Sequence, residues 1–442
     1  MKEPDQNELM QRGELPADPE DGAGPPVPLP ILDAAEARRA ATPAEPARRK
    51  SLAEAYDAAA EVMLSRARGV VRPIPTPWEG FNRRLRGGLW PGLAVLTSNT
   101  GSGKTQFAVQ LVISAARHFR EEQIRTGAEH ADRALYIALE LGEVDLTARV
   151  VGLLSGARWS DLYHGDYDPE GHCRPGERPD PNHLALLFQS HRPDVADLPI
   201  DVDTADAMRW TWQDLQKVGE EKRPPRLIVL DYTQLARAPA NGPREELRQT
   251  IAASALVGRD LARRHGIAVL AISSTARSNY GKVSGKGERG KAGERAFPVI
   301  PGETDSDVDE YIDIGKDAGE LEYTADVSFA LVRDPEPLQE QSLNERRAPS
   351  MVWPAIAKGR GIGAGWAPPV MFDGHCFTEA TPAQKSARNG RLEDWRDSKG
   401  NKAPAGKPDG EGGSNRGRRP LYQRLPGGGE GPEVDIGGYE DV

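Results

Sequence analysis

The sequence predicts an α/β fold in which a mainly parallel sheet carries helices on both faces. Two observations lead to this prediction. Short apolar runs alternate along the middle of the chain with amphipathic runs of helical period, which is typical of strand–helix units. Polar residues also fall just past the ends of four of the apolar runs, namely Lys104, Glu140, Asp231 and Ser273. Because ligands bind at the carboxyl ends of strands in such sheets, these residues indicate one functional edge.

The elements follow from local patterns in chain order. Short apolar runs predict strands over residues 93–96, 134–139, 198–202, 227–230, 267–272, 327–332 and 351–357, and then a hairpin over 370–377 that turns at Asp373 and Gly374. Helical spacing predicts helices over residues 106–116, 144–154, 206–218 and 244–265. The polar residues 157–184 and 278–320 predict loops.

Composition divides the chain into four segments. Residues 1–49, rich in Pro, Ala, Glu and Arg, cannot bury enough apolar surface to offset chain entropy, so we expect a disordered tail. We expect residues 50–70 to form a separate helix and residues 71–380 to form the folded domain. Residues 381–442 are polar and rich in Gly and Pro, which predicts a second disordered tail.

Charge and cysteine content restrict the class of protein. The net charge of −10 over 442 residues argues against a chain coated with nucleic acid, although it allows a local basic channel. The two cysteines give no disulfide framework, so a reducing cytoplasm is the expected compartment. The first 14 residues show no apolar signal segment, and no run is long and apolar enough to span a bilayer, so we expect no membrane partner.

The predicted first helix begins at Ser51, where Ser51 and Glu54 form a capping box, and it ends near Gly69. Its apolar residues fall on one stripe at helical spacing: Leu52, Ala55, Tyr56, Ala59, Val62 and Met63. The stripe could pack on its own domain or on a neighbouring subunit, and the residues alone leave both possibilities open.

A phosphate-binding loop is predicted where the first strand meets the next helix. Backbone N–H groups and the positive helix N-terminus of such a loop bind phosphates. Lys104 would reach the β- and γ-phosphates of ATP, and the Thr105 hydroxyl would hold Mg²⁺. One residue departs from the pattern G-x-x-x-x-G-K-[ST], which has glycine where Ser98 stands. The candidate nucleotide-binding residues are Ser98, Asn99, Thr100, Gly101, Ser102, Gly103, Lys104, Thr105 and Gln106.

Two carboxylates complete the candidate site. Asp231 ends a buried strand and suits a residue that orients the Mg²⁺ held by Thr105, although an aspartate there can also cap a turn. Glu140 is the candidate general base, because an attacking water needs a carboxylate within hydrogen-bond reach. Its alternative role is a charge near the N-terminus of the following helix.

Three further groups have weaker patterns. The Gly-rich segment with Lys358 and Arg360 could present positive charge to phosphates, but from its spacing alone a solvated turn is favoured. Basic residues over 282–295 could follow a nucleic-acid backbone or form a solvated loop. A set of His and Cys side chains is too irregularly spaced to predict zinc: His164, His172, Cys173 and His183.

From about Pro73 to Phe377, the order of these motifs resembles the C-terminal RecA-like P-loop NTPase domain of DnaB-type replicative helicases, which is kin to KaiC-type ATPases. The most specific segments are LIVLDYTQL over 227–235 and AKGRGIGAG over 357–365. Weaker likeness covers residues 81–92, 135–141, 198–204 and 317–326.

The resemblance implies an ATP-dependent DNA helicase or translocase that acts on single-stranded DNA in plasmid, phage or mobile-element replication. It implies a homo-oligomer, a hexameric ring with ATP at subunit interfaces, in which the helix over 51–68 is a linker that docks on the adjacent subunit. Arg360 and Lys358 would complete the neighbour's site, Lys316 and Gly319 would contact DNA, and Gln234 would couple the two sites.

Two departures from the family support an alternative. Ser274 stands where the family usually has a coupling glutamine, and the family's N-terminal helical collar has no counterpart in this sequence. The alternative is a KaiC-like regulatory or recombination-mediator ATPase without unwinding activity.

Overall fold

The computed structural model describes residues 51–99, 101–173, 177–204, 212–231, 247–274, 300–303, 305, 308, 319–335, 338 and 349–398. Every contact reported below lies within residues 51–395, in one compact unit of the chain. The predictions for residues 1–49, for the basic loop over 282–295, and for Thr100, Gln234 and Lys316 lie outside the described residues.

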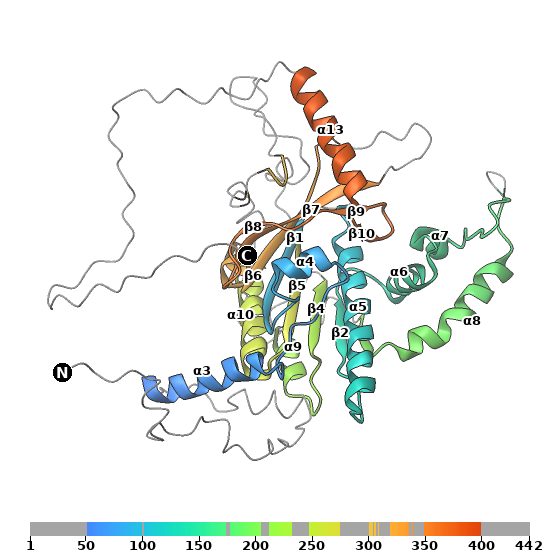
Figure 1. The fold of residues 1–442 in the computed structure, drawn as a ribbon. Coiled ribbons are helices and arrows are strands. Elements are labelled where there is room, and N and C mark those ends of the chain that lie inside the picture. The colour runs from blue at the N-terminus through green and yellow to red at the C-terminus, as the bar shows by residue number, and fades with distance from the viewer. Residues whose placement is uncertain are drawn as a thin grey trace, which may run out of the picture. The chain divides into compact units, whose positions relative to one another are not determined.

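A single sheet organises the described residues, with strand order β10-β9-β7-β6-β1-β5-β4-β2-β3 and β8 beside β7 (Figure 1). From β6 to β3 every neighbouring pair is parallel, and from β6 to β10 every pair is antiparallel. The predicted α/β fold with a mainly parallel sheet is therefore confirmed. The strands are β1 Gly92–Ser98, β2 Ala134–Ala138, β3 Ile200–Asp203, β4 Leu227–Asp231, β5 Ala268–Ser274, β6 Val327–Arg333, β7 Ser350–Gly359, β8 Gly365–Trp366, β9 Val370–Phe372 and β10 Phe377–Glu379.

Helices cover both faces of this sheet, because successive side chains of β1 enter two different helix-containing cores. Ala94 and Leu96 enter the core that contains α5, while Leu93 and Val95 enter the core that contains α9 and α10. None of the described helices is long and apolar enough to cross a membrane. The helices are α3 Leu52–Ala67, α4 Glu79–Arg84, α5 Lys104–Thr126, α6 Glu143–Ser155, α7 Trp159–His164, α8 Pro181–Asp197, α9 Trp212–Gly219, α10 Leu247–His265, α12 Gly319–Thr324 and α13 Pro382–Ser398.

Two stretches differ from the sequence prediction. Residues 157–184 were expected to form a loop, but α7 and the start of α8 lie there. Residues 381–398 were expected to belong to a disordered tail, but they form α13. The physical reason is tertiary: Arg388 of α13 is buried and forms an ion pair with Asp334 at 3.0 Å, a contact that polar composition cannot reveal.

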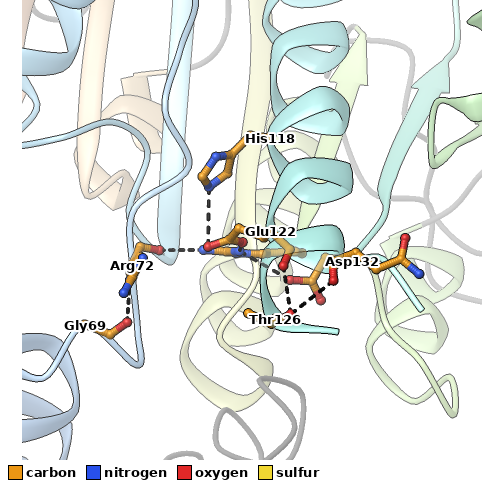
Figure 2. A network of polar contacts seen from close by, with 8 residues as sticks. Gly69, Arg72, His118, Glu122, Thr126 and Asp132 are labelled. Atoms are coloured by element: carbon orange, nitrogen blue, oxygen red, sulfur yellow. Dashed lines mark hydrogen bonds and ion pairs between the residues drawn. The ribbon is translucent and has the colours of Figure 1, made fainter. Parts of the chain in front are cut away.

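The edge of the sheet where the parallel strands begin is held by an ionic network (Figure 2). Arg226, just before β4, forms ion pairs with Glu122 at 2.5 Å and Asp132 at 3.2 Å and donates to the Arg72 carbonyl at 3.0 Å. Burial alone would raise the pKa of Glu122, but hydrogen bonding from His118 and the charge of Arg226 lower it to about 2. The network joins α5, the start of β2 and the chain that leaves α3.

Candidate functional site

The loop between β1 and α5 has the backbone that a phosphate loop requires, and residues 98–105 are called the phosphate loop below. Gly101 and Gly103 have φ of 76° and 93°, in the left-handed region that favours glycine. At Gly103 a Cβ would also lie 2.7 Å from Cζ of Phe372 and 2.8 Å from Cζ of Phe377. Any side chain at position 103 would therefore clash with the β9–β10 hairpin.

The structure explains why position 98 can be serine where the loop pattern has glycine. It is the last residue of β1, it is fully buried, and it is not among the described residues with positive φ. Its hydroxyl donates to the Leu331 carbonyl of β6 at 2.8 Å, and its register partner in β5 is Ser274. Because the backbone at position 98 is extended strand, glycine is not required there.

Lys104 lies inside the phosphate loop at the start of α5. Its Nζ donates to the carbonyls of Ser98 and Asn99, both at 2.8 Å. Burial lowers the pKa of this amine to about 8, and the charges of Asp231 and Glu140 oppose that shift. The structure therefore brings the loop lysine and the two predicted carboxylates together.

Asp231 is a buried carboxylate at the end of β4. Burial raises its pKa, and hydrogen bonding from Tyr136 and Thr105 opposes the rise. Tyr136 donates to Oδ2 at 2.7 Å, while Oδ1 is buried without a hydrogen-bond partner among the described residues. The buried Oδ1 atom and the Thr105 hydroxyl are both oxygen donors, the ligand type that Mg²⁺ prefers. Because a buried carboxylate oxygen needs a partner, these two residues fit the ion.

Glu140 follows β2 at the same edge. The amide of Leu139 donates to the Asp231 carbonyl at 2.6 Å, which ties the ends of β2 and β4 together. The Glu140 side chain is exposed, and partial burial and then the Asp231 charge raise its pKa, while Lys104 and Arg149 lower it. A water-accessible carboxylate with a raised pKa suits a general base.

Arg149 and Tyr136 belong to this cluster although sequence reasoning missed both. Arg149 of α6 donates to the Gln106 side chain at 3.1 Å, and its guanidinium lies 3.7 Å from the ring centroid of Trp159. Its Nε is buried without a described partner. Burial lowers the pKa of the guanidinium, and the nearby carboxylates of Asp145, Asp231 and Glu140 oppose that shift. The sequence offered one signal for Arg149: it is a single cation within a mostly apolar stretch of a predicted helix.

Lys358 and Arg360 lie at the opposite edge of the sheet. Gly359 between them pairs with Val327, the first residue of β6, whereas the phosphate loop follows the last residue of β1. The Arg360 guanidinium lies 3.2 Å from the Asp326 carboxylate, and Lys358 donates to the Tyr323 carbonyl. The structure therefore does not bring these cations to the phosphate loop of their own chain. Gly319, a predicted DNA contact, begins α12.

Residues 78–279 match the family described as the AAA domain. Among solved structures, one that is described as an ATPase domain is matched with a TM-score of 0.52 and 16% identity over 76% of this chain and 100% of that chain. A DnaB-like replicative helicase, solved in a study of its interactions with primase, is matched with a TM-score of 0.50 and 17% identity over 76% of this chain and 68% of that chain.

A KaiC-like protein from Pyrococcus horikoshii is matched with a TM-score of only 0.38 and 14% identity, over 70% of this chain and 100% of that chain. Comparison with curated proteins finds no match. The chain therefore shares its fold with these two ATPase structures, and this is the RecA-like fold that the order of motifs predicted. With its phosphate loop and paired carboxylates, the domain has the architecture of a P-loop ATPase.

Proposed function

We propose that the chain is an ATP-dependent DNA helicase or translocase of the hexameric DnaB type that acts in plasmid, phage or mobile-element DNA replication. One observation carries the proposal. Lys104, Thr105, Asp231 and Glu140 meet at one edge of a sheet that has the fold of a DnaB-type ATPase domain. These groups supply the parts that phosphoryl transfer to water needs.

In the proposed reaction each side chain has one task. Lys104 would bind the phosphate oxygens of ATP. The Thr105 hydroxyl would hold Mg²⁺ and Asp231 would orient it, and the bound ion would neutralise charge on those oxygens. Tyr136 keeps the Asp231 carboxylate oriented through its hydrogen bond to Oδ2. Glu140 accepts the proton of the attacking water.

Assembly into a ring would bring cations from one subunit to the phosphate loop of the next and would cover the exposed stripe of α3. Because Arg360 and Lys358 lie at the opposite edge from their own phosphate loop, they can complete the site of a second copy. The apolar stripe of α3 is not covered by the described residues, since Leu52, Tyr56 and Met63 are 87%, 71% and 64% exposed. This exposure favours docking of α3 on a neighbouring subunit over packing on its own domain.

Single-stranded DNA is the proposed partner. Under this proposal the DNA-contacting residues are Lys316 and Gly319, and Gln234 and Ser274 couple nucleotide state to DNA contact. Ser274 also favours the second candidate, a KaiC-like regulatory or recombination-mediator ATPase, because serine replaces the expected glutamine at the end of β5, beside Ser98.

The test is the ATPase rate of the full chain with and without single-stranded DNA. We expect DNA to stimulate hydrolysis several-fold, and Glu140→Gln to abolish it because an amide cannot accept the proton. Glu129→Gln is the matched control, since Glu129 is exposed and follows α5 at the far end from the phosphate loop. A rate that DNA leaves unchanged would refute the helicase proposal and favour the regulatory ATPase.

A further inference from the structure

Arg333, the last residue of β6, reaches the phosphate loop from the side opposite the carboxylates. Strand β6 lies beside β1, on the other side from β5, so its end is next to the start of the loop. The Arg333 guanidinium donates from Nη2 to the Gly101 carbonyl at 2.9 Å and lies 5.8 Å from the ring centroid of Phe372. No sequence motif drew attention to this arginine.

The backbone at Arg333 is anchored through the next residue, Asp334. Asp334 follows it directly, is fully buried, accepts from Arg388 of α13 at 3.0 Å and accepts from the Trp353 indole at 3.1 Å. The backbone that carries the Arg333 side chain is therefore anchored by a buried ion pair. Phe372, which the guanidinium faces, stacks on Phe377 with ring centroids 4.2 Å apart, and both rings pack against Gly103.

The Gly101 contact matters because a phosphate loop binds anions with its N–H groups. A carbonyl that turned toward the phosphates would repel them, so the loop must keep its carbonyls directed elsewhere. A guanidinium bonded to the Gly101 carbonyl stabilises that orientation with a charge-assisted hydrogen bond and leaves positive charge beside the loop.

We propose that Arg333 is a positioning residue that holds the phosphate loop in its anion-binding conformation and thereby sets the affinity for the nucleoside triphosphate. This inference rests on the proposed function, because it concerns the same nucleotide site. Arg333 acts through the loop backbone and takes no part in the transfer of the phosphoryl group.

The experiment measures binding of a fluorescent methylanthraniloyl-ATP with Mg²⁺ to the full chain, and the KM and kcat of ATP hydrolysis. Arg333→Gln should raise the Kd and the KM about tenfold, the effect of about 1.4 kcal/mol that a charge-assisted hydrogen bond supplies. The kcat at saturating ATP should stay within about threefold of the wild type, since no transition-state contact is removed. Arg333→Lys should give an intermediate Kd because lysine keeps the charge but not the planar fork.

Arg391→Gln is the matched control, because Arg391 of α13 also donates to a backbone carbonyl, that of Leu338 at 2.9 Å, away from the loop. It should leave the Kd unchanged, and both variants should keep the melting temperature within about 2 °C of wild type. A wild-type Kd for Arg333→Gln, or a loss of kcat without a change in KM, would overturn the inference. Failure of the wild-type chain to bind the probe would instead refute the proposed function.

Discussion

At the scale of single residues, Arg149 links the parts of the candidate site that chain order keeps apart. Its guanidinium contacts Gln106 on α5 and the Trp159 ring of α7, and its charge acts on Glu140. A cation in this position lowers the pKa of the candidate general base and keeps more of it ionised. Arg149 therefore packs α6 against α5 and α7 and also lowers the pKa of Glu140.

Replacing Arg149 with Gln should move the acid limb of the kcat–pH profile to higher pH. Arg149 lowers the pKa of Glu140, so its removal lets that pKa rise, and the base then needs a higher pH to be ionised. Loss of the cation–π and Gln106 contacts should also cost about tenfold in kcat/KM at neutral pH. The measurement is ATP turnover as a function of pH.

Arg149→Lys keeps the charge and should keep the acid limb in place, and Arg125→Ala, at an exposed position near the end of α5, is the neutral control. An unshifted profile for Arg149→Gln would show that its charge does not act on the base.

At the scale of elements, the ionic network of Arg226 decides how α5, β2, β4 and the chain leaving α3 meet. Arg226 is 7% exposed and compensates both Glu122 and Asp132. Figure 2 shows Glu122, Asp132 and Arg72 converging on this point from separate segments. A buried charge with these partners fixes the relative position of those segments, because movement of any one of them breaks an ion pair or the hydrogen bond to the Arg72 carbonyl.

Arg226→Met should lower the free energy of unfolding by about 3 kcal/mol at pH 7, because it leaves two partly buried carboxylates without their arginine partner. Urea denaturation measures the change, and Arg223→Ala, which removes an exposed arginine nearby, should have little effect. The folded-state pKa of Glu122 is depressed to about 2 from 4.5. The stabilisation from ionised Glu122 is present above pH 4.5 and is lost toward pH 2. The difference in free energy of unfolding between variant and wild type should therefore narrow as the pH falls from 4.5 to 2. A gap independent of pH would contradict this account.

At the scale of the whole molecule, the proposed ring depends on surfaces that a single chain leaves unused. The apolar stripe of α3 is exposed, and Arg360 lies at the edge opposite its own phosphate loop. Both features are explained if each subunit receives a helix and a pair of cations from its neighbours. Monomeric proteins seldom leave such a stripe in solvent.

Tyr56→Glu combined with Met63→Glu should dissociate the ring without unfolding the domain, because both side chains are more than half exposed in the single chain. Native mass spectrometry should show subunits instead of hexamers, and ATP hydrolysis should fall with assembly because Arg360 and Lys358 would no longer reach a second site. Glu61→Gln, on the same helix, is the control. Rings that persist in the double variant would show that α3 is not the contact.

Local pattern determined most of the elements of this protein. Short apolar runs predicted most strands of the sheet, and period-3.6 spacing predicted α5, α6, α9 and α10. The capping box predicted the start of α3 at Ser51, and Asp373-Gly374 predicted the β9–β10 hairpin. The phosphate loop was also predictable, because its glycines and Lys104 are neighbours in the chain and the backbone geometry they need is local.

Only the tertiary structure decided which distant side chains meet. Tyr136 and Arg149 join the candidate site, and Arg333 reaches Gly101, through contacts between elements that no local spacing encodes. The helix α13 forms around a buried ion pair between residues 54 positions apart. The antiparallel direction of β7 places Arg360 at the far edge of the sheet, because strand direction depends on pairing between segments and not on the residues of the strand itself.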